Sequence, residues 1–440
     1  MQENFYELAD YLAGKLHGDE VFLATFDGEE SDFVRFNRSL VRQAGSVTQR
    51  YLTLDLIRGQ RHAKSTFTMT GEAAIDRARL DALLAELRVD LQHVPEDPYL
   101  LYPTELHSSE RHGERATPDR ESALAAILKA GEGRDLVGIF AQGGIFAGFA
   151  NSFGQRNWFS SFSFNLDWSF YLREDKAVKT SYAGFAWDVA EFGRKVQTAV
   201  RQLEILGREP KTIQPGQYRV YLAPPAMAEF AEMLCWGGFS LKAHRTKSTP
   251  LLKMIEEGAR LSPAVTLREN TRDGIAPNFQ AAGFIKPDAV TLIENGQCRD
   301  TLVSPRSAKE YGVPPTGAGG GESPESLEMA PGDVPRDDIL RRLGTGVYVN
   351  QLWYLNYSDR PAARITGMTR FATFWVEDGR IAAPLNVMRF DETAYRVLGE
   401  NLIGLTRERD FMPDPDTYEA RSTSSTRLPG ALVDKFTFTL

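Results

Sequence analysis

Alternating apolar and polar positions predict an amino-terminal region in which helices flank a set of strands. Apolar residues at helical spacing predict helices over residues 3–17, 72–89, 119–130 and 188–206. Period-two patterns predict strands over 21–26, 33–37, 46–58, 62–68, 159–172 and 179–186, with Leu52, Leu54 and Leu56 on one face. Glycines predict turns at Asp27-Gly28 and at Gln142-Gly143-Gly144, the second as the bend of a hairpin over 136–149.

The clearest element is a strand followed directly by a helix, over residues 218–236. The strand ends at Pro224-Pro225, and proline is tolerated in the first turn of a helix because its missing N–H has no partner there. Gly237-Gly238 is expected to end the helix. One helical face is apolar, carrying Met227, Phe230, Ala231, Leu234 and Cys235.

Further strands are predicted over 265–269, 290–294, 347–354, 374–377, 384–390 and 436–440, with a hairpin turn at Asp378-Gly379. A helix is predicted over 248–257, capped by Ser248 or Thr249. Residues 305–335 are rich in Gly, Pro and Ser and predict a mobile loop. Their glycine run, 316–323, lacks the lysine of a phosphate-binding loop.

The predicted fold class is α+β. An amino-terminal α/β domain is expected over residues 1–212, in two segments of about 1–92 and 119–212. A larger carboxy-terminal domain over 213–440 is expected to be rich in antiparallel strands. A chain of 440 residues is long enough for two or three domains.

Charge and composition narrow the function classes. A formal net charge of −8 argues against a nucleic-acid partner, which requires a basic face. No apolar run approaches the roughly 20 residues of a membrane span, and the first residues lack a signal-peptide pattern. Cys235 and Cys298 are too few for a disulfide framework. We therefore expect a cytoplasmic protein without membrane or nucleic-acid partners.

Several motifs together resemble one known family. They are the helix with proline at its start and glycine at its end, the Lys-Ser-Thr-Pro-Leu of 247–251, the Leu-Trp-Tyr-x-Asn of 352–356 and the Ile-Thr-Gly-Met-Thr-Arg of 365–370. This combination is similar to the TldE/PmbA half of the TldD/PmbA peptidase family, over nearly the whole chain.

The resemblance implies where zinc chemistry would be found. In the TldD half, the corresponding helix carries His-Glu-x-x-x-His, and a cysteine from a later loop completes the zinc site. Placed on that pattern without gaps, this chain has Glu232-Met233-Leu234-Cys235-Trp236-Gly237. A methionine cannot act as the base that a zinc hydrolase needs. We therefore expect no catalytic residue, no metal ligand and no cofactor in this chain, with zinc only in a TldD-type partner.

Three residues remain as candidates for contact with a cavity or a substrate: Glu232, His244 and Arg245. Cys235 lies on the apolar helix face and is expected to be part of the core. A metal site built from His93, His107 and His112 is an alternative, but their wide spacing favours solvated loop histidines.

The resemblance implies a TldE/PmbA-like subunit of a TldD/TldE-type metallopeptidase, involved in proteolysis or maturation of small or unfolded peptides. This chain would supply partner surface and cavity wall. The alternative is a stand-alone homodimeric peptide-binding or structural protein without catalytic activity. The expected partners are accordingly a TldD-type zinc-binding subunit or a second copy of the chain, together with a peptide substrate.

Overall fold

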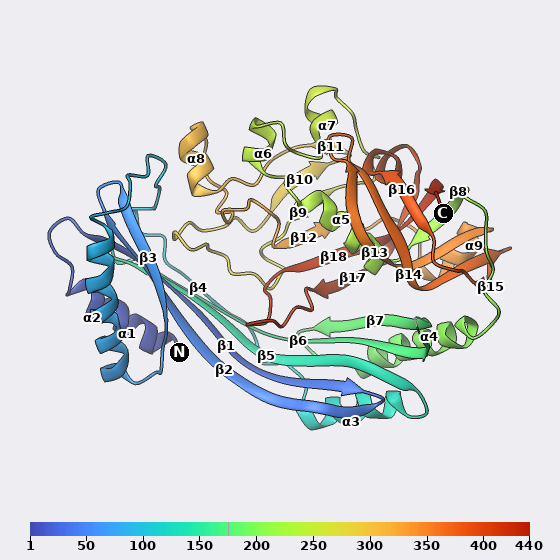
Figure 1. Ribbon diagram of the computed structural model, residues 1–440, viewed down its shortest axis with the longest axis horizontal. Coiled ribbons are helices and arrows are strands. Elements are labelled where there is room, and N and C mark those ends of the chain that lie inside the picture. The colour runs from blue at the N-terminus through green and yellow to red at the C-terminus, as the bar shows by residue number, and fades with distance from the viewer. Residues whose placement is uncertain (175) are drawn as a thin grey trace.

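The computed structural model describes residues 1–174 and 176–440 as two large sheets with flanking helices (Figure 1). The amino-terminal elements are α1 (Gln2–Ala13), β1 (Val21–Asn37), β2 (Leu40–Arg58), β3 (Arg61–Thr68), α2 (Ala73–Asp90), β4 (Ser109–His112), α3 (Arg120–Gly131), β5 (Asp135–Asn151), β6 (Arg156–Arg173), β7 (Lys176–Gly184) and α4 (Val189–Leu206).

The carboxy-terminal elements begin where the sequence predicts a strand and a helix. They are β8 (Gly216–Leu222), α5 (Pro224–Cys235), α6 (Leu241–Arg245), α7 (Leu252–Glu256), β9 (Leu267–Glu269), β10 (Val290–Glu294), β11 (Gln297–Cys298), α8 (Pro305–Tyr311), β12 (Ser326–Met329), η1 (Arg336–Asp338), α9 (Ile339–Leu343), β13 (Gly346–Asp359), β14 (Arg364–Glu377), β15 (Arg380–Pro384), β16 (Arg389–Thr393), η2 (Arg396–Glu400), β17 (Leu402–Pro413) and β18 (Ser425–Phe438). The predicted fold class, α+β, is confirmed. No helix in the described ranges combines the length and apolar character that crossing a bilayer requires.

The first sheet has seven strands in the order β3-β2-β1-β5-β6-β4, with β7 paired to β6. All its pairings are antiparallel except β4 with β6. Because β1 pairs with β5, strands from the segments 1–92 and 119–212 share one sheet. Figure 1 shows α1 and α2 at one end of this sheet and α3 and α4 towards the other.

The two turns predicted from glycines in this region are wrong. Strand β1 runs through Asp27-Gly28, and β5 runs through Gly143-Gly144. These glycines leave room for neighbouring atoms, which are side chains at Gly28 and Gly144 and backbone at Gly143. At Gly143, where φ is 141°, an added Cβ would lie 2.0 Å from the carbonyl oxygen of Glu30. Glycine within a strand often marks such a close approach of another backbone.

Burial follows the predicted alternation in β2, where Leu52, Leu54 and Leu56 are buried, but not in β6. Strand β6 is buried on both faces, because helices cover one face of the sheet and the carboxy-terminal region covers part of the other. Two apolar residues of the predicted helices 72–89 and 188–206, Ile75 and Val189, are exposed.

The second sheet has eleven strands in the order β11-β10-β9-β12-β18-β16-β14-β13-β8, with β15 on β14 and β17 on β18. Strand β8 pairs with both β13 and β18, so β8, β13, β14, β16 and β18 form a closed ring. Asp378 and Gly379 both have positive φ, as the predicted hairpin turn requires.

Two predictions in this region are wrong. Helix α7 is short and its N-cap is Leu251, whereas Thr249 accepts a hydrogen bond from the Leu251 N–H just before the helix. The stretch 305–335 contains α8 and β12. It is held by buried Glu322, whose carboxylate accepts hydrogen bonds from Ser240 and Ser304.

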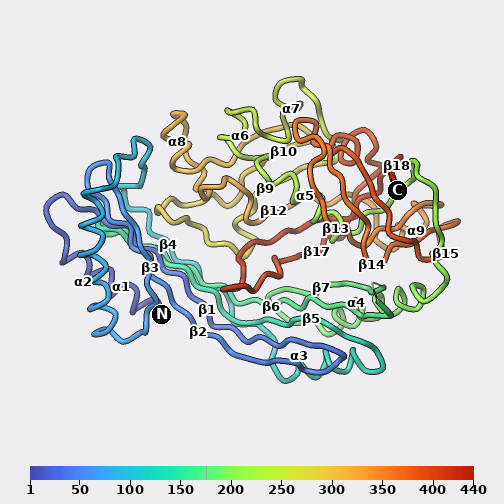
Figure 2. Tube along the Cα trace, viewed as in Figure 1, coloured from blue at the N-terminus to red at the C-terminus, as the bar shows by residue number. Residues whose placement is uncertain are grey.

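The segment between β17 and β18 reaches across to the first sheet, as the trace in Figure 2 shows. Its Arg421 is only 9% exposed. The guanidinium donates to Oγ and the carbonyl of Ser163 (2.7 and 3.1 Å) and to the carbonyl of Gly143 (3.2 Å). Burial lowers the pKa of Arg421 to about 10, although nearby Glu29 opposes the change. The small side chains of β5 and β6 leave room for this cation.

Replacing Arg421 with alanine is expected to lower the free energy of unfolding by roughly 2–4 kcal/mol, because it removes charge-assisted hydrogen bonds and leaves buried acceptors unpaired. Urea denaturation of the whole chain measures this loss. The matched control is Arg380→Ala, which truncates an exposed arginine on β15. Equal stability of the two variants would contradict this account of the domain contact.

A second buried charge lies at the pairing of β9 with β12. Glu269 accepts hydrogen bonds from the backbone N–H groups of Glu325 and Ser326 (both 3.0 Å). Beside it, Lys286 donates to the Glu325 carboxylate at 2.7 Å. Burial raises the pKa of Glu269 from its ordinary 4.5 to about 7.

This raised pKa predicts how stability depends on pH. Between pH 4.5 and about 7, the folded chain holds a proton on Glu269 that the unfolded chain has lost. The stabilisation that this proton gives the folded state is therefore complete below pH 4.5 and disappears as pH rises through 7. This difference in pKa corresponds to a change of roughly 3 kcal/mol in the free energy of unfolding. The stability difference between wild type and Glu269→Gln should therefore change across pH 4.5–7. Exposed Glu294→Gln should show no such change, and a flat difference for Glu269→Gln would be inconsistent with the buried carboxyl.

Candidate functional site

Helix α5 has one face in the core and one face on a cavity. Its buried face packs on β13 and β18 and comprises Ala226, Met227, Phe230, Ala231, Met233 and Leu234. Prolines fill its first turn as predicted, and the helix ends at Cys235, followed by Gly237 with φ of +84°. The other face carries Pro225, Ala228, Glu229, Glu232 and Cys235, which all line the cavity.

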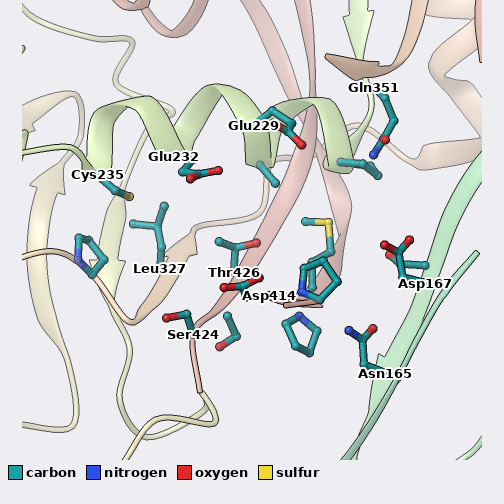
Figure 3. A pocket seen from close by; sticks show the side chains of 18 of the residues that line it. Asn165, Asp167, Glu229, Glu232, Cys235, Leu327, Gln351, Asp414, Ser424 and Thr426 are labelled. Carbon is teal, nitrogen blue, oxygen red and sulfur yellow. The ribbon is translucent and has the colours of Figure 1, made fainter. Parts of the chain in front are cut away.

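The cavity has a volume of about 380 Å³ and lies between the two sheets. Its other walls come from both halves of the chain. The first sheet contributes Asn165, Asp167, Lys179, Thr180 and Ser181. The carboxy-terminal half contributes Trp236, Ser323, Pro324, Leu327, Gln351, Met412, Pro413, Asp414, Pro415, Ser424, Ser425 and Thr426. Figure 3 shows Glu229 and Glu232 on α5, with Asn165 and Asp167 on the strand opposite and Asp414 between the two walls.

Carboxylates dominate the chemistry of this cavity. Burial raises the pKa of Glu229, and the charge of Glu232 raises it further, although Lys179 and Arg370 oppose the change. Burial and the charge of Asp414 raise the pKa of Glu232, whereas a hydrogen bond from Trp236 lowers it. The carboxyls therefore repel one another, with Glu229 half-buried and Glu232 and Asp414 exposed on the cavity wall.

Two further titratable groups line the cavity. Burial raises the pKa of Asp167, and Lys179, whose Nζ lies 3.2 Å from its Oδ2, partly offsets this. Burial raises the pKa of Cys235 far above neutrality, so its thiol is protonated and a poor nucleophile. Cys235 packs against the core, as predicted from the helix pattern, but it also lines the cavity.

The sequence candidates fall in two places. Glu232 lines the cavity, whereas His244 and Arg245 are not among the described residues that line it. His244 lies on α6, where its Nε2–H donates to the Gly238 carbonyl at 2.7 Å. Burial lowers the pKa of His244, which favours the neutral ring. Arg245 is exposed at the end of the same helix.

The loop histidines are not brought together. His93 is exposed, and His107 and His112 each lie beside a different glutamate, Glu105 at 3.6 Å and Glu110 at 3.4 Å. Across residues 1–174 and 176–440, no three His, Cys, Asp or Glu side chains are grouped so that they could hold a metal ion.

Sequence reasoning missed three of the four acidic residues of the cavity. Glu229 precedes Glu232 by three residues and so lies on the same helical face, and this spacing could have identified it. Asp167 and Asp414 are distant in sequence, and only the packing of the two sheets brings them to α5. No local pattern in the sequence marks them.

The structure also tests the register in which the zinc motif was placed. Met233, at the base position, is 2% exposed and points into the core, and Gly237 lies beyond the end of the helix. In that register, Glu232 lines the cavity, but Met233 and Gly237 are not among its described lining residues. The face that does point there carries no histidine between Pro225 and Cys235, so it offers none of the nitrogen ligands that the His-Glu-x-x-x-His motif supplies to zinc.

Comparison with known proteins identifies the family. The family model described as "PmbA/TldA metallopeptidase C-terminal domain" matches residues 215–440. No curated protein matches the chain. Several solved structures share the whole fold, including the following two. TldE from Thermococcus kodakarensis has a TM-score of 0.80 at 15% identity, covering 100% of this chain and 99% of its own.

The second structure is a candidate modulator of a DNA gyrase from Thermotoga maritima. It has a TM-score of 0.78 at 17% identity and covers 100% of both chains. At these identities the two structures show a common fold alone, and the match to residues 215–440 shows the family. This chain belongs to the PmbA/TldD family of metallopeptidase-related proteins.

Proposed function

We propose that this chain is a TldE/PmbA-like subunit of a two-chain peptidase, in which a TldD-type partner holds the zinc ion. One observation carries the proposal: helix α5 borders a cavity of about 380 Å³, as a catalytic helix would, yet its cavity face bears Glu229, Glu232 and Cys235 and no histidine. The family supplies the expectation of peptide chemistry. The cavity supplies the reason to assign this chain a supporting role.

The remaining groups of the cavity support the same role. A hydrolytic base must lie beside an activated water or nucleophile. The Cys235 thiol is protonated, and Lys179 is paired with Asp167. In this proposal the chain helps to enclose and position small or unfolded peptides in the cytoplasm, and the partner performs the cleavage.

The similarity in fold to the Thermococcus kodakarensis TldE is consistent with this assignment. The stand-alone homodimer remains the competing hypothesis, and it makes a different prediction. A homodimeric binding or structural protein should show no dependence on a TldD-type chain.

The decisive test combines this chain with a TldD-type chain from the same organism. We expect the two to co-purify, the pair to cleave unfolded peptides, and neither chain to cleave them alone. Chelation should abolish the activity of the pair, and zinc should restore it. Peptide release followed by mass spectrometry, with zinc analysis of each separated chain, gives both results.

The matched control is a pair in which the glutamate of the partner's zinc motif is replaced by glutamine, which should assemble but fail to cleave. Full, chelator-sensitive cleavage by this chain alone would overturn the proposal. A stable homodimer that does not bind the TldD-type chain in sedimentation experiments would favour the competing hypothesis.

A further inference from the structure

The charges that line the cavity do not balance. Its described lining residues include four carboxylates, Asp167, Glu229, Glu232 and Asp414, and one basic side chain, Lys179. Lys179 is already within 3.2 Å of Asp167. The remaining three carboxylates line the same cavity, Glu229 half-buried and Glu232 and Asp414 exposed, and like charges this close raise one another's free energy.

A separate observation on the opposite wall indicates a missing ligand. Asn165 is 9% exposed and points into the cavity (Figure 3), but its side-chain amide makes no hydrogen bond to any residue within 1–174 and 176–440. Two residues along the same strand, Oδ1 of Asp167 is buried and has no partner among those residues. That oxygen has almost no accessible surface and so does not open onto the cavity, whereas the Asn165 amide does. Buried polar groups without partners are uncommon in native proteins.

The chemistry of the missing ligand follows from these groups. The carboxylates of Glu229 and Glu232 line the cavity and accept hydrogen bonds, so a group bound between them must be a donor. No three of the acidic groups in the described ranges are placed to share one metal ion. An organic cation with several N–H donors can instead contact carboxylates that lie apart. A volume of about 380 Å³ is large enough for an amino-acid side chain.

We propose that this cavity binds a positively charged group of a peptide, either an α-ammonium group or the side chain of lysine or arginine. Glu229, Glu232 and Asp414 provide the negative charge, and the side-chain oxygen of Asn165 accepts a hydrogen bond from the opposite wall. Identifying the ligand as a peptide rests on the proposed function. The selectivity for positive charge rests on the cavity alone.

The raised pKa values of Glu229 and Glu232 agree with this arrangement, because each reflects burial together with a neighbouring negative charge. A bound cation would counter that repulsion. The charged and polar groups that act on Glu232 are Asp414 and Trp236, and those that act on Glu229 are Glu232, Lys179 and Arg370.

The proposal can be tested by isothermal titration calorimetry on the whole chain without a partner. The probes are tetra-alanine amide with a free amino group, its N-acetylated form, and N-acetylated peptides of the same length with one lysine or one arginine. We expect the cationic peptides to bind at least tenfold more tightly than the neutral one. Whether the free amine, lysine or arginine binds best identifies the source of the charge. Binding should weaken as salt is added.

Substitutions then locate the site. Glu229→Gln and Glu232→Gln should each weaken binding of the cationic peptides by fivefold or more, and Asn165→Leu by a smaller factor. Glu7→Gln, which removes one charge from an exposed position on α1, should leave binding unchanged. The glutamines preserve side-chain shape, and an unchanged thermal unfolding transition would show that each variant is folded.

Equal binding of neutral and cationic peptides, or no binding of either, would overturn the proposal. So would saturable binding of zinc or magnesium chloride that Glu232→Gln abolishes, because the cavity would then be a metal site. Peptide binding is measured without the partner and without turnover. A failure here therefore leaves the subunit assignment intact, and a failure of the two-chain cleavage test leaves the charge selectivity intact.

Discussion

The packing of helix α5 against the second sheet determines most of what this protein can do. Its apolar residues, including Met227, Phe230 and Leu234, must be buried against β13 and β18. A helix has 3.6 residues per turn, so fixing that face in the core also fixes which side chains point the other way. Glu229 and Glu232 reach the cavity for this reason, and Met233 cannot. The chemistry of the site follows from the helix's hydrophobic pattern.

The opposite wall of the cavity depends on the contact between the two halves of the chain. The segment from β17 to β18 contributes Asp414 and Ser424 to the cavity, and between them it places Arg421 in the first sheet. One segment therefore both joins the domains and shapes the site. Within the carboxy-terminal half, Ser323, next to buried Glu322, links two walls of the cavity, because its hydroxyl donates to the Cys235 carbonyl at the end of α5. The cavity walls are thus anchored by buried polar contacts that reach well beyond the cavity itself.

Local signals predicted some elements well. The limits of α5 were foreseen from Pro224-Pro225 and Gly237, and the hairpin at Asp378-Gly379 from its dipeptide. The long strands β1 and β5 were each broken in two by the prediction, because their glycines resemble turn residues. At Gly143 the reason for the glycine is a contact with Glu30, more than a hundred residues away. Long-range contacts are also the reason that the site was predicted only in part. Glu232 was identified from the helix, but Asp167 and Asp414 reach the cavity only through tertiary packing, which no local pattern encodes.

The central claim is that the helix expected to hold a hydrolytic zinc ion presents carboxylates and no histidine in this chain. The most direct measurement is anomalous scattering at the zinc absorption edge, from crystals of this chain grown without a partner and soaked in zinc. We expect no ordered anomalous peak within ligand distance of Glu232. A strong peak there, with protein ligands around it in tetrahedral geometry, would contradict the account.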